Sequence, residues 1–174
     1  MNSKLGKFSL TAVFFALVFV FNTAVSGQEK SAPQILNEAA ARRIVPSSFY
    51  FAGQSAPTQI RNSAVALLGA DRRIIAGLVD TSGYSTEISG KYEGFLITDS
   101  PVKVGGKTLG TGAYGFGFST DGKLHIFDLS SREIMAVETK NDAEMKRPRP
   151  LMMNVAADGV RFYKGKNYAL ITVK

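Results

Sequence analysis

The stretch from Val102 to Leu129 constrains the fold most, because turn-forming residues divide it into short extended segments. Gly105-Gly106 and Asp121-Gly122 both favour tight hairpin turns, since glycine adopts positive φ at low energetic cost. Between these turns, residues 113–119 alternate aromatic side chains with glycine, the period-two pattern of a β-strand. The stretch therefore predicts two consecutive β-hairpins.

A two-residue turn at Asp121-Gly122 also predicts which residues of the second hairpin lie opposite one another. The expected pairs are Phe118 with His125, Phe116 with Phe127, and Tyr114 with Leu129. We expect these six side chains to form an aromatic ladder on one face and much of the core. Alternate glycines on the other face, Gly115 and Gly117, predict the close approach of another segment or a bend.

The segment from Gly110 to Gly115 matches the G-x-G-x-x-G pattern of dinucleotide-binding loops. That pattern binds pyrophosphate where it follows a strand and opens a helix. Here a glycine–aromatic repeat and a tight turn follow, so no helix is expected. A kinase glycine loop is excluded because the chain is short and lacks the H-R-D and D-F-G motifs. We interpret these glycines as hairpin residues.

Further strands are predicted where β-branched and aromatic residues lie between turn signals. They cover residues 48–52, 58–68, 73–80, 94–98, 134–137, 151–156, 160–163 and 168–173. Residues 142–146 suit a turn of helix, and 147–150 an extended segment outside regular sheet, because proline lacks the N–H group. The pattern predicts an all-β fold, either an antiparallel β-sandwich or a flattened barrel built of hairpins.

One short N-terminal helix is predicted from Ile35 to Ile44, with Ser31 and Gln34 as a capping box. It would lie against the sheet or form part of a linker over residues 28–46. Residues 47–174 are then expected to form a single β domain.

Residues 1–27 have the organisation of a secretory signal peptide. Two lysines precede an apolar run from Leu10 to Phe21, and the small residues of Ala24-Val25-Ser26 suit a cleavage site. An uncleaved membrane anchor is the alternative, but polar residues in the run favour cleavage. The absence of cysteine excludes a lipoprotein anchor and disulfide bonds. We expect export to the periplasm or the extracellular space.

Removing 27 of the 174 residues, two lysines among them, leaves 147 residues and lowers the net charge from +7 to +5. A modest positive charge suits an anionic envelope surface or polymer. The basic residues are scattered, so nucleic acid is not an expected partner. Membrane contact is expected only through an uncleaved N-terminal segment.

Catalytic and metal-binding patterns are weak in this chain. His125 is the only histidine and there is no cysteine, so we interpret it as a packed or half-buried side chain. The G-x-S-x-G motif of serine hydrolases is absent. Seven acids near strand ends have no diagnostic spacing: Asp80, Glu87, Glu93, Asp99, Asp128, Glu133 and Glu138. We therefore predict no catalytic residue, no metal, no cofactor and no enzymatic activity.

Two sets of side chains are candidates for ligand binding. Exposed aromatic residues could stack on sugars, although strand aromatics more often form the core. The candidates are Phe49, Tyr50, Phe51, Tyr84, Tyr92, Tyr114, Tyr163 and Tyr168. The one compact basic cluster, Lys146, Arg147 and Arg149, could bind a phosphate or carboxylate, with a solvated loop as the preferred interpretation.

Four segments together resemble a group of uncharacterised secreted bacterial β-sandwich proteins: residues 48–54, 76–84, 112–118 and 142–148. The spacing of Gly106, Leu109, Gly112 and Tyr114 is similar, more loosely, to larger bacterial β-sandwich domains of unknown function. The resemblance covers about Pro46 to Lys174. It implies export and an all-β fold, and it implies no activity and no site.

Three functions remain open from the sequence. The first is an exported, non-catalytic module that binds a small or polymeric envelope ligand in a concave apolar pocket with a few polar groups. The second is a structural or adaptor protein that binds an envelope protein through a sheet edge or apolar patch. The third is a hydrolase with two carboxylates in a cleft.

Overall fold

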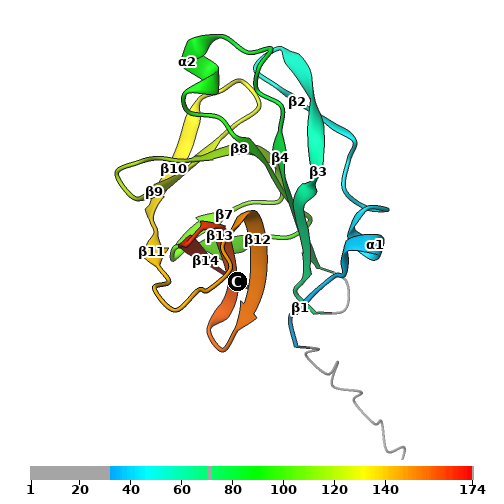
Figure 1. Ribbon diagram of the computed structural model, residues 1–174, viewed down its shortest axis with the longest axis vertical. Helices are drawn as coiled ribbons and strands as arrows, with labels where there is room; N and C mark the ends of the chain where they lie inside the picture. The colour runs from blue at the N-terminus through cyan, green and yellow to red at the C-terminus, as the bar shows by residue number, and fades with distance from the viewer. Residues whose placement is uncertain (1–31, 70–71, 174) are drawn as a thin grey trace, which may run out of the picture.

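The computed structural model describes residues 32–69 and 72–173, which form an all-β sandwich of two antiparallel sheets (Figure 1). The predicted signal peptide, residues 1–27, and Ser31 lie outside these ranges. The larger sheet runs in the order β1 (Gln34–Ile35), β3 (Gln54–Leu67), β4 (Arg73–Val79), β5 (Gly94–Thr98), β8 (Gly112–Phe118), β9 (Lys123–Phe127) and β10 (Glu133–Glu138), with β2 (Ser48–Phe51) paired to β3. The smaller sheet runs β12 (Arg149–Ala156), β13 (Gly159–Gly165), β14 (Asn167–Val173), β6 (Val102–Val104) and β7 (Lys107–Leu109), with β11 (Lys140–Asn141) beside β14.

The two predicted hairpins are present, but they lie in different sheets. The β6–β7 hairpin turns at Gly105 and Gly106, whose φ angles of 54° and 84° confirm the two-residue turn. It belongs to the smaller sheet, whereas β8 and β9 belong to the larger one. The chain therefore crosses between the sheets after β5 and again before β8.

The predicted register of the β8–β9 hairpin is wrong by one residue. The Ser119 amide donates to the Lys123 carbonyl, and the Gly122 amide donates to the Ser119 carbonyl, which closes a three-residue loop over residues 120–122. Gly122 has φ of 83°, as the third position of such a loop requires. Phe118 consequently lies opposite Leu124 rather than His125.

This shift moves half of the predicted ladder to the other face of the sheet. Phe116 packs between the sheets with Leu124 and Ile126, in a core that also includes residues of β12, β13 and β14. His125 and Phe127 point to the outer face of the larger sheet, where Phe127 joins a second core.

The second core covers the outer face of the larger sheet with β2, the segment around α1 (Glu38–Ala41) and the segment around α2 (Thr86–Ser89). Phe51 stacks on Tyr92 with ring centroids 3.9 Å apart, and Phe49 stacks on Phe95 at 4.8 Å. All four rings are buried. The larger sheet is thus covered on both faces.

The glycines of β8 admit this second layer, as their alternation predicted. A Cβ atom at Gly115 would overlap the Phe51 ring, and one at Gly117 would overlap the carbonyl oxygen of Lys91. The close approach that the sequence predicted is therefore made by β2 and by the segment after α2.

Three expectations about local structure are corrected. The helix expected from Ile35 to Ile44 is not found over that length, because Ile35 pairs with Ala66 in β1 and Asn37 caps a single turn, α1. Residues 142–146 form a turn rather than helix. Arg149 and Pro150 were expected outside regular sheet, but they begin β12, whose pairing with β13 shifts register between Arg149 and Met152.

We expect Gly117→Ala to lower the free energy of unfolding by roughly 1–3 kcal/mol, because the new methyl group meets backbone that has little freedom to move. Gly83→Ala is the matched control, since a Cβ there meets open space. Urea unfolding of both variants measures the difference. Equal losses of unfolding free energy in the two variants would contradict the close approach of the Lys91 backbone to Gly117.

Candidate functional site

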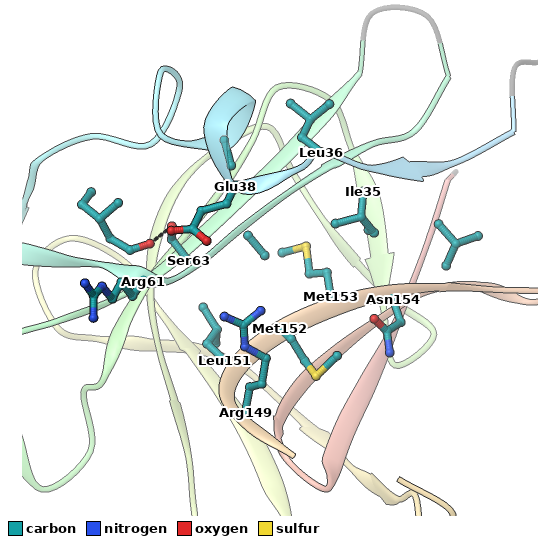
Figure 2. Close-up of a pocket in the computed structure, with 14 residues that line it drawn as sticks. Ile35, Leu36, Glu38, Arg61, Ser63, Arg149, Leu151, Met152, Met153 and Asn154 are labelled. Carbon is teal, nitrogen blue, oxygen red and sulfur yellow. Dashed lines mark hydrogen bonds between the residues drawn. The ribbon is translucent and has the colours of Figure 1, made fainter. Parts of the chain in front are cut away.

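A groove opens where β12 passes the segment that contains β1, α1 and β3 (Figure 2). Its volume is about 530 Å³. Nine apolar residues from both walls contribute to its lining: Ile35, Leu36, Ala41, Ile60, Ala64, Leu151, Met152, Met153 and Val155. Five polar or charged side chains complete the lining: Glu38, Arg61, Ser63, Arg149 and Asn154.

A bulge in β3 forms part of one wall. Thr58 pairs with Val79 and Ser63 with Gly77, so four residues of β3 lie opposite a single residue of β4. The Ser63 hydroxyl donates to the Ile60 carbonyl at 2.6 Å, which holds the bulge closed. Because a bulge redirects the side chains that it contains, Ile60 and Arg61 reach the groove.

Three charged residues, Glu38, Arg61 and Arg149, contribute to the lining of the groove (Figure 2). Glu38 accepts two hydrogen bonds from Arg42, at 2.5 and 3.2 Å. The Arg42 guanidinium is the main cause that lowers the pKa of Glu38, and the charges of Arg149 and Arg61 lower it further. Among the described residues, neither Arg61 nor Arg149 forms an ion pair within 4.0 Å. The groove therefore carries an excess of positive charge.

The structure separates the predicted basic cluster. All three residues are exposed, as is Arg61, but Arg149 lines the groove, whereas Lys146 and Arg147 lie in the segment before β12 and do not line it. Arg61 was missed, because an isolated arginine within a predicted strand carries no signal of its own. Only the fold places it beside a residue 88 positions later in the chain.

A second, more open hollow lies beside the start of β12, with a volume of about 650 Å³. Arg149 lines it as well, together with Asn141, Lys164, Lys166 and Asn167 among others. Lys164 is already bound to Glu93, whose other carboxylate oxygen accepts from the Phe118 amide. This ion pair ties the smaller sheet to the larger one.

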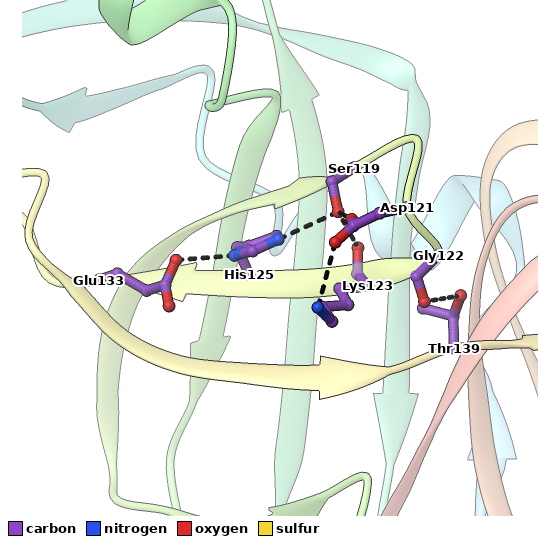
Figure 3. Close-up of polar contacts among 7 residues, drawn as sticks. All are labelled: Ser119, Asp121, Gly122, Lys123, His125, Glu133 and Thr139. Carbon is purple, nitrogen blue, oxygen red and sulfur yellow. Dashed lines mark hydrogen bonds and ion pairs between the residues drawn. The ribbon is translucent and has the colours of Figure 1, made fainter.

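Ser119, just after β8, forms a hydrogen-bonded row with His125 of β9 and Glu133 of β10 (Figure 3). The Ser119 Oγ lies 3.0 Å from His125 Nε2, and His125 Nδ1 lies 2.7 Å from Glu133 Oε2. These distances match those of a serine–histidine–carboxylate triad. The half-buried histidine agrees with the sequence interpretation, but its two partners were not anticipated.

A further contact, from Ser119 to Asp121, is inconsistent with an activated serine. Ser119 Oγ also contacts the Asp121 carboxylate, and a hydroxyl has one hydrogen to donate. A hydrogen given to Asp121 leaves Ser119 as the acceptor of a hydrogen from His125, the reverse of what a nucleophile needs. We interpret the row as a set of structural hydrogen bonds that links β9 and β10 to the end of β8.

The other predicted candidates do not assemble into a site. Six of the seven acids contact separate partners: Asp80 with Ser82, Glu87 with Lys91, Glu93 with Lys164, Asp99 with Arg73, Asp128 with Arg132, and Glu133 with His125. Within residues 32–69 and 72–173, no group of three histidine, cysteine or acidic residues lies where it could hold a metal ion. Of the eight aromatic candidates only Tyr50 is exposed, which confirms the core interpretation.

No helix in the described part of the chain has the length and apolar character needed to cross a membrane. Comparison of the chain with protein-family models, with curated proteins and with solved structures finds no match. The resemblance to secreted bacterial β-sandwich proteins therefore stays a prediction, and the geometry of the groove carries the functional argument.

We expect Asp121→Asn to flatten the fall in melting temperature between pH 7 and pH 3. The Ser119 hydrogen bond, followed by Lys123, lowers the pKa of Asp121 below the model-peptide value of 3.8. A lowered carboxyl pKa stabilises the fold while the group is ionised, and this stability is lost as pH falls through the folded-state pKa. Circular dichroism melts across this pH range measure the effect.

Ser119→Ala provides the companion variant, because it removes the largest cause of the lowered pKa. Its pH profile should change in the same direction as that of Asp121→Asn. If the melting temperatures of both variants fell with pH in parallel with that of the unmodified protein, the role of the Ser119–Asp121 hydrogen bond would be contradicted.

Proposed function

We propose that this protein is an exported, non-catalytic module that binds a small amphipathic ligand in the groove between β12 and the β1–α1–β3 segment. The observation that carries the proposal is a concavity in which apolar residues and polar or charged side chains meet at one place, as they do in many ligand sites. Its volume of about 530 Å³ lies within the range of small-molecule sites. Export rests on the N-terminal sequence.

The chemistry of the lining favours a lipid-like ligand over a carbohydrate. Sugars are usually bound on exposed aromatic faces, and the groove is lined by leucine, isoleucine, methionine and alanine instead. Met152 and Met153 are flexible and polarisable, so they can adapt to a flexible chain. A non-catalytic role accords with the row at Ser119, in which the hydroxyl hydrogen is directed to Asp121.

An adaptor role is the second candidate, supported by a different surface. Tyr50 and Leu129 are 57% and 40% exposed, and together with Ile88 they line a shallow hollow beside the β2–β3 turn. This surface lies on other elements than the groove, so the two roles can be tested separately.

Binding in the groove can be measured with a tryptophan reporter, since the chain has no tryptophan. We expect the fluorescence of Met152→Trp, in the groove, to shift to the blue when dodecanol is added below its solubility limit. Tyr50→Trp, on the adaptor surface, should not respond. Equal responses, or none in either variant, would contradict a ligand site in the groove.

Blocking the groove provides an independent test. Val155→Arg should abolish dodecanol binding measured by native mass spectrometry, because a long charged side chain enters an apolar opening. Val155 is 45% exposed, so the fold should tolerate the change. Ile134→Arg, at a residue 42% exposed on β10, is the matched control and should bind as before.

A further inference from the structure

We infer that the ligand of the groove is a single-chain amphiphile with an anionic head group, and that Arg61 and Arg149 together hold that head group. The inference rests on the proposed function and adds the chemical class of the ligand. It follows from the charge balance of the groove, from the positions of the two arginines in their strands, and from the apolar lining beside them.

The charge balance favours an anion. Three guanidinium groups, Arg42, Arg61 and Arg149, lie within electrostatic reach of one carboxylate, Glu38. Arg42 already neutralises that carboxylate through two hydrogen bonds. Two positive charges therefore remain without a carboxylate partner among the described side chains that line the groove. Guanidinium groups bind carboxylates and phosphates through paired hydrogen bonds, so an anionic group complements them.

Both arginines lie at irregularities of the strands that carry them. Arg61 is within the four-residue bulge of β3, and Arg149 is at the start of the register shift in β12. In a regular strand the side-chain direction follows from the pleat, whereas a bulge re-aims a side chain independently of its neighbours. Two bulges on opposite walls bring two distant arginines to the same groove.

The apolar residues next to the arginines indicate the chemistry of the part of the ligand beyond its charged group. Leu151, Met152 and Met153 follow Arg149 along β12 after Pro150, and Ile60 precedes Arg61 in β3. A ligand whose charge lies at the arginines therefore places its remaining atoms against apolar side chains. An alkyl chain bearing a carboxylate or a phosphate monoester fits both parts, and a free inorganic anion uses only one.

The test compares dodecanoate, dodecyl phosphate, dodecanol and inorganic phosphate on the full chain by isothermal titration calorimetry, with the two anionic amphiphiles below their micelle concentrations and dodecanol below its solubility limit. We expect both anionic amphiphiles to bind roughly tenfold more tightly than dodecanol, the gain typical of a charge-assisted hydrogen bond. Inorganic phosphate should not displace dodecanoate from the protein. If phosphate displaced dodecanoate, the inference of an amphiphilic ligand would be overturned, and the groove would be a simple anion site.

Substitutions test whether the two arginines bind the head group. Arg61→Gln and Arg149→Gln should each weaken dodecanoate binding by roughly five- to tenfold and leave dodecanol binding unchanged. Lys146→Gln and Arg147→Gln are matched controls, because these residues are exposed like Arg61 and Arg149 but do not line the groove. Glu38→Gln should strengthen dodecanoate binding, since it removes the one negative charge of the lining.

The outcomes separate this inference from the proposed function. Dodecanol and dodecanoate that bind equally, with no effect of the arginine variants, would overturn the anionic head group and leave the groove as an apolar ligand site. Failure of every amphiphile to bind would overturn both. Equal weakening by the Lys146 and Arg147 controls would show a general effect of net charge and overturn the assignment to the two arginines.

Discussion

The structure depends on the absence of side chains at two positions of β8. Gly115 and Gly117 leave room for the Phe51 ring and for the backbone at Lys91, so a second aromatic layer lies directly on the outer face of the larger sheet. A sheet with one solvated face would need polar residues at these positions. Here both faces bury apolar area, which stabilises a chain without disulfide bonds.

Much of the fold could be predicted because its turns are local. The turn at Gly105-Gly106 requires positive φ at both residues, and glycine pairs meet that requirement without help from the rest of the chain. Asp121-Gly122 was misjudged because Gly122 also suits the last position of a three-residue loop. One extra loop residue exchanges the two faces of β9, so a small error in the turn produced a large error in the predicted core.

The site was harder to predict because it depends on tertiary pairing. The helical pattern after Ser31 was overridden where Ile35 found a strand partner in β3, and tertiary hydrogen bonds of this kind outweigh a weak helical propensity. Arg149 was identified within a basic cluster, but the arginine that lines the groove with it is Arg61 rather than Arg147. No local sequence pattern predicts the bulge in which four residues of β3 lie opposite one residue of β4.

The groove exists because two strands depart from regular pairing at the same corner of the sandwich. Pro150 cannot donate a ladder hydrogen bond, which accounts for the register shift at the start of β12. The β3 bulge is held by Ser63 and Ile60 on the facing wall. Regular strands would bring apolar side chains together there and close the corner, as they do elsewhere between the sheets. Both strands that depart from regular pairing thus line the groove, and each contributes one of its two arginines.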